Sequence, residues 1–122
     1  MVGPATQPSG ERRGIHVTGT LINTVRGADG TVVVDVRREI DLDSAERLRA
    51  IITDAATRLR PPRLIVDLLH VTFIDSVGIG ALAAGRNAAR AVGIGFTLRH
   101  PSAFVTAQLR QTGLYDELVT DR

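Results

Sequence analysis

The sequence predicts a small α/β domain with a mixed central β-sheet of about four to five strands, an N-terminal antiparallel hairpin and about three to four helices. Two strand-like segments flank an Asp29-Gly30 pair, a dipeptide that favours a tight hairpin turn. Beyond the hairpin, helical and strand-like patterns alternate along the chain. A near-continuous apolar run at residues 64–69 has the length and composition of a central strand that is covered on both faces.

The hairpin is expected from two segments near the N-terminus. Residues 15–25 begin with alternating apolar and polar side chains, which is typical of a strand with one buried face. Residues 31–36 are mostly β-branched and apolar, and we expect them to pair with the first segment in antiparallel orientation.

The first helix is expected after a short polar link at residues 37–42. Asp43 stands three residues before Glu46, which is the spacing of a capping box at a helix start. The apolar residues that follow recur at helical spacing on one face, and a Pro-Pro pair ends the helix. This helix is then the crossover to a buried strand that begins at residue 63.

The second helix is expected from about residue 75 to residue 91, in a segment rich in alanine and glycine. Glycine costs a helix roughly 1 kcal/mol relative to alanine, so the small residues indicate a close approach to the sheet or to another protein. Residues 94–98 predict another strand, and Pro101 or Ser102 starts a third helix. Residues 114–119 are expected to form a last short strand or a turn.

Composition narrows the class of protein. A length of 122 residues fits one domain, which we expect at residues 15–122 after a flexible, Gly- and Pro-rich tail at residues 1–14. The absence of cysteine excludes disulfides, thiol catalysis and Cys-ligated metals, and it fits a reducing cytoplasm. Apolar runs fall short of the roughly 20 residues that span a bilayer, and no signal peptide is recognisable.

The charge pattern argues against a nucleic-acid partner. All fifteen basic residues are arginine, and the formal net charge is only +2. The isoelectric point of about 10.3 is high because few groups titrate between the terminal amine and the arginines. The arginines are scattered among acidic residues, so they do not form a basic patch.

An Asp75-Ser76 pair stands where the second helix should begin, just after the buried strand. Both residue types are common helix N-caps and need no further role there. A helix N-terminus also favours an anion, and the Val-Gly-Ile-Gly sequence that follows leaves space around the serine hydroxyl. We therefore consider Ser76 a candidate phosphorylation site on a protein-binding surface.

Other candidate sites are weaker. His16, His70 and His100 are isolated and lack the spacing of metal ligands, so no metal site is expected. The sequence around Ser76 lacks a Gly-x-Ser-x-Gly elbow, and the nearby glycines lack the spacing of a dinucleotide fingerprint. We expect no enzymatic activity and no cofactor. An acidic group earlier in the chain is either a solvated edge or a patch that faces arginines of a partner: Glu39, Asp41 and Asp43.

The central part of the chain resembles a known family. Residues 64–68 followed by residues 71–82 resemble the signature of STAS domains, specifically the small stand-alone bacterial anti-sigma factor antagonists. Residues 38–45 resemble the acidic segment that enters that family's first helix, and residues 109–114 resemble the end of its third helix. The similarity extends over about residues 15–119 and implies a STAS-like fold.

The resemblance also implies a mechanism. In this family the unphosphorylated antagonist binds an anti-sigma factor that is also a serine kinase, and the sigma factor is released. Phosphorylation of the motif serine, here Ser76, ends that binding, and a serine phosphatase restores it. Asp75 and Gly78 match the acid and the glycine of the family motif. We expect the partner to dock on the start of the second helix, at Asp75, Ser76, Val77, Gly78, Ile79 and Gly80, with Glu39, Asp41 and Asp43 beside them.

Two features differ from the family pattern, and two other functions stay open. Val77 replaces a second hydroxyl that some members carry after the serine, and little chain remains after Val119 for a closing helix.

One alternative function is a STAS-like accessory module without phosphorylation, either a scaffold in a signalling complex or a cytoplasmic subunit of a lipid or anion transporter. The other is a nucleotide-binding domain. The sequence leaves both a monomer and a dimer open.

Overall fold

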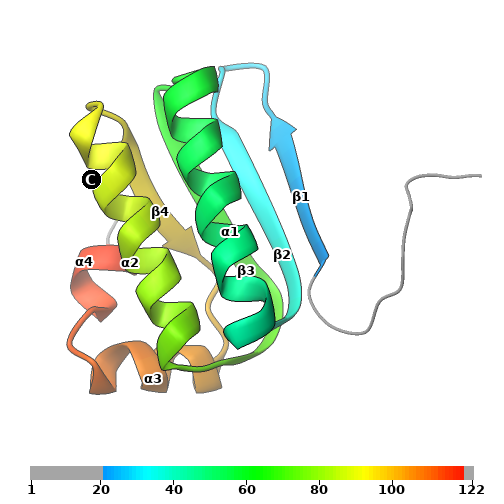
Figure 1. Cartoon of the computed structure of the whole chain (residues 1–122), viewed down its shortest axis with the longest axis vertical. Helices are drawn as coiled ribbons and strands as arrows, with labels where there is room; N and C mark the ends of the chain where they lie inside the picture. Colours follow the sequence, from blue (N-terminus) through cyan, green and yellow to red (C-terminus); the bar gives the residue numbers. More distant parts are fainter. Residues whose placement is uncertain (1–20, 120–122) are drawn as a thin grey trace, which may run out of the picture.

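The computed structural model describes residues 21–119, which form a β-sheet with helices packed against it (Figure 1). The expected tail and residues 15–20 of the expected first strand lie outside this part of the chain. In chain order the described elements are β1 (Leu21–Arg26), β2 (Val32–Ile40), α1 (Leu42–Asp54), the π-helical turn η1 (Ala55–Leu59), β3 (Arg63–Ile74), α2 (Ser76–Ala91), β4 (Gly95–Arg99), α3 (Ala103–Gln111) and α4 (Tyr115–Val119).

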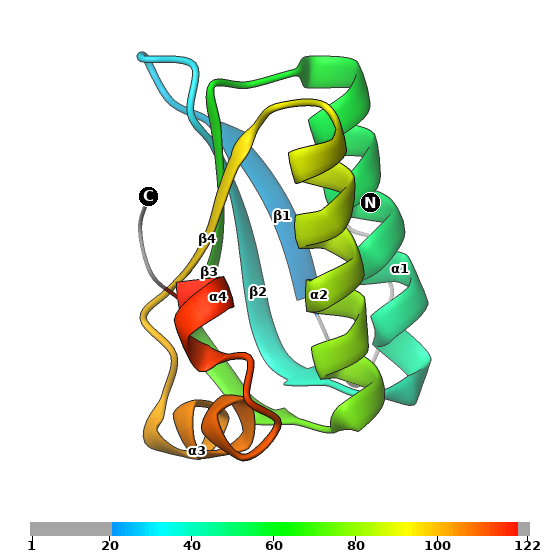
Figure 2. The ribbon, with the colours of Figure 1, turned by 90° about the vertical axis from the view of Figure 1, so that its left-hand side faces the viewer.

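The strands form one mixed sheet in the order β1-β2-β3-β4. β1 runs antiparallel to β2, whereas β2, β3 and β4 run parallel to one another. α1 and α2 lie side by side on one face of the sheet, and α3 and α4 lie toward its other face, beside β3 and β4 (Figure 2). The arrangement confirms the predicted α/β class, the mixed sheet and the N-terminal hairpin.

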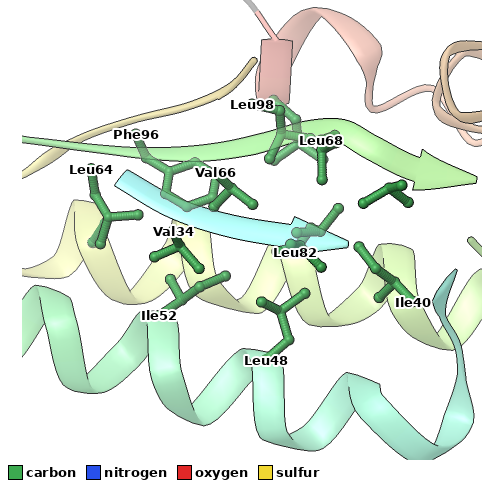
Figure 3. Packing of buried hydrophobic residues seen from close by; sticks show 14 of the residues in the cluster. Val34, Ile40, Leu48, Ile52, Leu64, Val66, Leu68, Leu82, Phe96 and Leu98 are labelled. Atoms are coloured by element: carbon green, nitrogen blue, oxygen red, sulfur yellow. The ribbon is translucent and has the colours of Figure 1, made fainter. Parts of the chain in front are cut away.

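The main core lies between the sheet and the helices α1 and α2. Alternate residues in the first halves of β2 and β3 are fully buried, as expected when one face of a strand meets the core. The parallel register places Val34 beside Val66. Figure 3 shows both side chains on the side of the sheet that carries Leu48 and Ile52 of α1 and Leu82 of α2.

β2 and β3 are both longer than the sequence suggested. The expected polar link at residues 37–42 is wrong, because β2 continues through Ile40 and pairs there with Ile74 of β3. In this polar stretch the ladder is irregular: it has two register shifts, and the backbone at Arg38 is left-handed (φ 82°). Ile40 and Ile74 are both buried, and the burial of these two side chains stabilises the extended ladder.

Helix α1 therefore begins two residues earlier than predicted. Its N-cap is Asp41, not Asp43, because Asp41 is the first residue beyond the strand ladder. The Asp41 side chain accepts hydrogen bonds from the backbone N–H groups of Asp43 and Ser44, and the Ser44 hydroxyl accepts one from the Asp41 N–H at 3.1 Å. This pair is a capping box made with serine in place of the expected glutamate.

Two glycines of α2 allow the helix to approach its own fold closely. A Cβ added at Gly78 would lie 2.5 Å from the carbonyl oxygen of Ile40, and one added at Gly85 would lie 2.7 Å from Cγ2 of Ile52. At Gly80 an added Cβ would meet nothing within 4 Å. Close packing within the domain thus explains Gly78 and Gly85, whereas Gly80 faces open space.

The last described element is the helix α4, where the sequence suggested a strand or a turn. Gly113 adopts φ +78° and ends α3, after which the chain turns and a short helix buries Leu118. The hydroxyl of Thr97 on β4 donates to the backbone carbonyl of Val119 at 2.9 Å and ties α4 to the edge of the sheet. Among residues 21–119, no helix combines the length and the apolar character that crossing a bilayer requires.

Candidate functional site

Ser76 is the first residue of α2 and stands at the edge of the sheet where β3 ends. Only Asp75 separates it from Ile74, the last residue of the strand. The Asp75 N–H donates to the carbonyl of Ile40 at 3.2 Å, which fixes the strand-to-helix turn against β2. The Ser76 side chain is exposed, and no residue among 21–119 hydrogen bonds to its hydroxyl.

Asp75 performs the capping that the sequence assigned to either residue of the pair. Its carboxylate accepts a hydrogen bond from the Gly78 N–H at 2.8 Å, and its carbonyl accepts one from the Ile79 N–H at 2.9 Å. The Ser76 hydroxyl is therefore not required to start the helix. It lies at the positive end of the helix dipole, where an added anion is favoured.

The six residues assigned to this helix start differ in their exposure. Ser76, Val77 and Gly80 are exposed, and Asp75 is half-buried. Gly78 and Ile79 are buried within the domain. These two residues support the surface from beneath, so a docking protein would contact the others.

The acidic residues lie at the same edge of the sheet as Ser76. Because β2 and β3 end side by side, the starts of α1 and α2 are neighbours (Figure 2). Glu39 and Asp43 are exposed, whereas Asp41 is half-buried and caps α1. The structure thus groups the acidic residues with the helix start, although they are 30 or more residues apart in the sequence.

An aromatic pair that was not predicted from the sequence lies beside this site. The rings of Phe73 on β3 and Phe104 on α3 stack with centroids 5.5 Å apart and an interplanar angle of 26°. Phe73 is 41% exposed and Phe104 is 42% exposed. Phe73 could be associated with the site from the sequence, because it stands two residues before Asp75. The position of Phe104 depends on how α3 packs, and the sequence does not indicate it.

A second group of charged side chains links the neighbouring strands β3 and β4. Asp67 accepts a hydrogen bond from Arg99 at 2.9 Å and lies 3.4 Å from the ring of His100. Burial raises the pKa of Asp67, but hydrogen bonds from Arg99 and the Leu69 N–H, together with the Arg99 charge, lower it further than burial raises it. Its pKa is therefore below the ordinary value, and the carboxylate joins neighbouring strands.

The described histidines do not form a metal site. His70 and His100 are exposed, and residues 21–119 contain no group of three or more histidine, aspartate or glutamate side chains arranged to hold a metal ion. His16 lies outside the described residues.

Comparison with known families matches most of the chain. The family model of the STAS domain matches residues 24–122. The anti-sigma factor antagonist SpoIIAA in its unphosphorylated form aligns with a TM-score of 0.71 and 24% identity, over 84% of this chain and 88% of that one. The phosphorylated form of SpoIIAA from Bacillus aligns with a TM-score of 0.65 and 24% identity, over 84% and 91%.

Two further structures share the architecture. An anti-sigma factor antagonist from Mycobacterium paratuberculosis aligns with a TM-score of 0.68 and 29% identity, over 82% of this chain and 83% of that one. A sulfate transporter family protein from Wolinella succinogenes aligns with a TM-score of 0.65 and 21% identity, over 77% and 75%. At 24% and 21% identity, the likenesses to SpoIIAA and to the sulfate transporter family protein show the fold alone.

Proposed function

The chain belongs to the STAS domain family, and on this basis we propose that it is an anti-sigma factor antagonist of the cytoplasm, switched off by phosphorylation of Ser76. One observation carries the proposal. The Ser76 hydroxyl is exposed at the first position of α2, while Asp75 alone caps the helix. The likeness at 29% identity to an anti-sigma factor antagonist from Mycobacterium paratuberculosis supports it, and SpoIIAA, whose structure exists in unphosphorylated and phosphorylated forms, shares the fold.

In the proposed cycle, the unphosphorylated protein binds an anti-sigma factor that is also a serine kinase, and the sigma factor is released. The kinase supplies ATP and magnesium. The Ser76 oxygen attacks the γ-phosphorus, the bond between this phosphorus and the ADP oxygen breaks, and a base on the kinase takes the hydroxyl proton. This chain contributes the hydroxyl and its placement, with no catalytic residue and no cofactor of its own.

The phosphate acts through its charge. It adds about −1.5 to −2 charges at neutral pH. The start of α2 tolerates this charge because free backbone N–H groups and the helix dipole favour an anion there. A docked protein would have to desolvate the phosphate beside the carboxylate of Asp75, so binding is lost. A serine phosphatase then hydrolyses the phosphoester and returns the protein to its binding form.

Incubation with the anti-sigma factor kinases of the same genome and ATP tests the proposal. We expect one kinase to add a single phosphate, detected by intact-protein mass spectrometry and mapped to Ser76 by peptide sequencing. Ser76→Ala should abolish the modification. Thr72→Val, which removes an exposed hydroxyl four residues upstream, should be phosphorylated as the wild type is. If Ser76→Ala is still phosphorylated, the assignment of the site is wrong. It is also wrong if none of the kinases phosphorylates the wild type.

The second function that the sequence left open is an accessory module that is not phosphorylated. The likeness to the sulfate transporter family protein does not favour it, because that likeness shows the fold alone. The same kinase assay separates the two functions.

A further inference from the structure

We infer that the docking surface extends from the start of α2 onto α3, and that the stacked rings of Phe73 and Phe104 are its apolar anchor. The anchor fits an apolar pocket with a basic rim on the anti-sigma factor kinase. The inference rests on the proposed function, since it assigns residues to that protein's binding surface. Neither phenylalanine belongs to the Asp-Ser segment or to the acidic segment.

The fold holds both rings in place at the edge of the sheet. Phe73 lies on β3, where its ladder partner on β2 is Glu39. Phe104 lies in the first turn of α3, which Ser102 caps by accepting a hydrogen bond from the Val105 N–H at 3.1 Å. Val105 is fully buried, which anchors this turn beneath Phe104. The pair is therefore a preorganised feature, and ordering it on binding costs little entropy.

The two rings are among the exposed apolar side chains on the elements that meet at this edge of the sheet. Single exposed apolar residues are ordinary, but a group of them that includes aromatic rings marks an interaction site. Val77 is 45% exposed in the first turn of α2, and Leu42 is 71% exposed at the start of α1. We call the four residues Leu42, Phe73, Val77 and Phe104 the apolar rim.

Charge around the apolar rim indicates what covers it. Residues 39–45, where β2 ends and α1 begins, and residues 73–80, where β3 ends and α2 begins, carry four carboxylates and no arginine: Glu39, Asp41, Asp43 and Asp75. A second copy bound through the same surface would bring these carboxylates against each other. A partner with basic side chains around an apolar pocket complements both features, and we commit to that occupant.

The inference explains how one phosphate controls the whole surface. Phe73 is three residues from Ser76 and Val77 is next to it, so a phosphate on Ser76 would stand beside the apolar rim. Docking of the aromatic anchor would then remove a charge of about −1.5 to −2 from water, which disfavours binding.

Calorimetry with the kinase that phosphorylates Ser76 tests the anchor. Phe104→Ala in the unphosphorylated protein should raise the Kd about 30-fold, as expected for an aromatic hot spot. Leu59→Ala is the matched control, because Leu59 is 41% exposed but lies at the C-terminal end of α1 and η1, away from Ser76. It should bind as the wild type does.

Further measurements separate the possible failures. Phe104→Leu keeps an apolar side chain and should bind between the wild type and Phe104→Ala, with circular dichroism confirming that all variants are folded. In a Phe73→Ala and Phe104→Ala cycle, the double variant should lose less affinity than the two single losses combined, because the rings act as one unit. Raising the salt concentration should weaken binding to the basic rim.

Each outcome has a distinct meaning. If the wild type is neither bound nor phosphorylated by any kinase of the genome, the proposed function fails and the inference falls with it. If the wild type is bound and phosphorylated but Phe104→Ala binds as tightly as Leu59→Ala, only the anchor is overturned. If Phe104→Ala instead changes the mass in sedimentation equilibrium and leaves kinase binding intact, the surface is a contact between copies and the inference is likewise overturned.

Discussion

Asp75 and Ser76 follow one another at the start of α2, and the geometry gives them different tasks. The carboxylate of Asp75 turns inward to the Gly78 N–H and completes the helix cap. The hydroxyl of Ser76 is left exposed at the positive end of the dipole. Because capping does not need the hydroxyl, its chemistry can change without loss of the helix.

A charged mimic of phosphoserine should therefore act on binding and leave folding intact. We expect Ser76→Asp to weaken binding to the kinase by about tenfold or more, which is about 1.4 kcal/mol or more. Its free energy of unfolding in urea should stay within about 0.5 kcal/mol of the wild type, since the residue is exposed at a helix N-terminus.

Ser76→Asn is the matched control for this prediction, because asparagine has the shape of aspartate without its charge. It should bind more tightly than Ser76→Asp in the same titration. Equal affinities for the two variants would show that size, and not charge, interferes with docking.

At the scale of the elements, α2 combines close packing on one side with open space on the other. Gly78 meets the backbone of Ile40, whereas Gly80 is exposed to solvent four positions after Ser76. The two glycines are two residues apart, so they point to different sides of the helix.

Replacing each glycine by alanine should move stability in opposite directions. Gly78→Ala places a Cβ 2.5 Å from a backbone oxygen that has little freedom to move, and we expect a loss of about 1–3 kcal/mol. Gly80→Ala meets no atom within 4 Å and should gain about 0.5–1 kcal/mol from improved helix propensity. Urea unfolding of both variants measures the two effects. Losses of similar size in both would contradict the packing of α2.

The sequence was informative where a local pattern determines structure and less so where pairing partners do. The alternation of strands and helices predicted the fold class, and the Asp-Ser pair predicted the start of α2. The start of α1 was misplaced at Asp43 because the pairing of Ile40 with Ile74 extends β2, and that pairing is invisible in a local pattern. Phe104 was missed because only the packing of α3 brings it to Phe73.

At the scale of the whole molecule, the parallel arrangement of β2, β3 and β4 gathers the site. Parallel strands place their carboxyl ends at one edge of the sheet, which is where α/β folds form binding sites. The ends of β2 and β3 lie there, together with the starts of α1 and α2 (Figure 2). Segments that are distant in the sequence thus form one surface, while the strands beneath it are held in register partly by Asp67 and Arg99.

The Asp67 carboxylate should make the stability of the whole domain depend on pH. Its pKa is lower in the folded protein than in the unfolded chain, so it stabilises the fold above the unfolded value of about 3.9, and this contribution is lost as the pH falls through the folded pKa. Asp67→Asn should therefore be less stable than the wild type at pH 7, and the difference should shrink below about pH 4 in urea titrations. Asp54→Asn, in an exposed pair with Arg58, is the control and should stay within about 0.5 kcal/mol of the wild type at either pH. A difference between Asp67→Asn and the wild type that is the same at both pH values would mean that the side chain acts by shape alone.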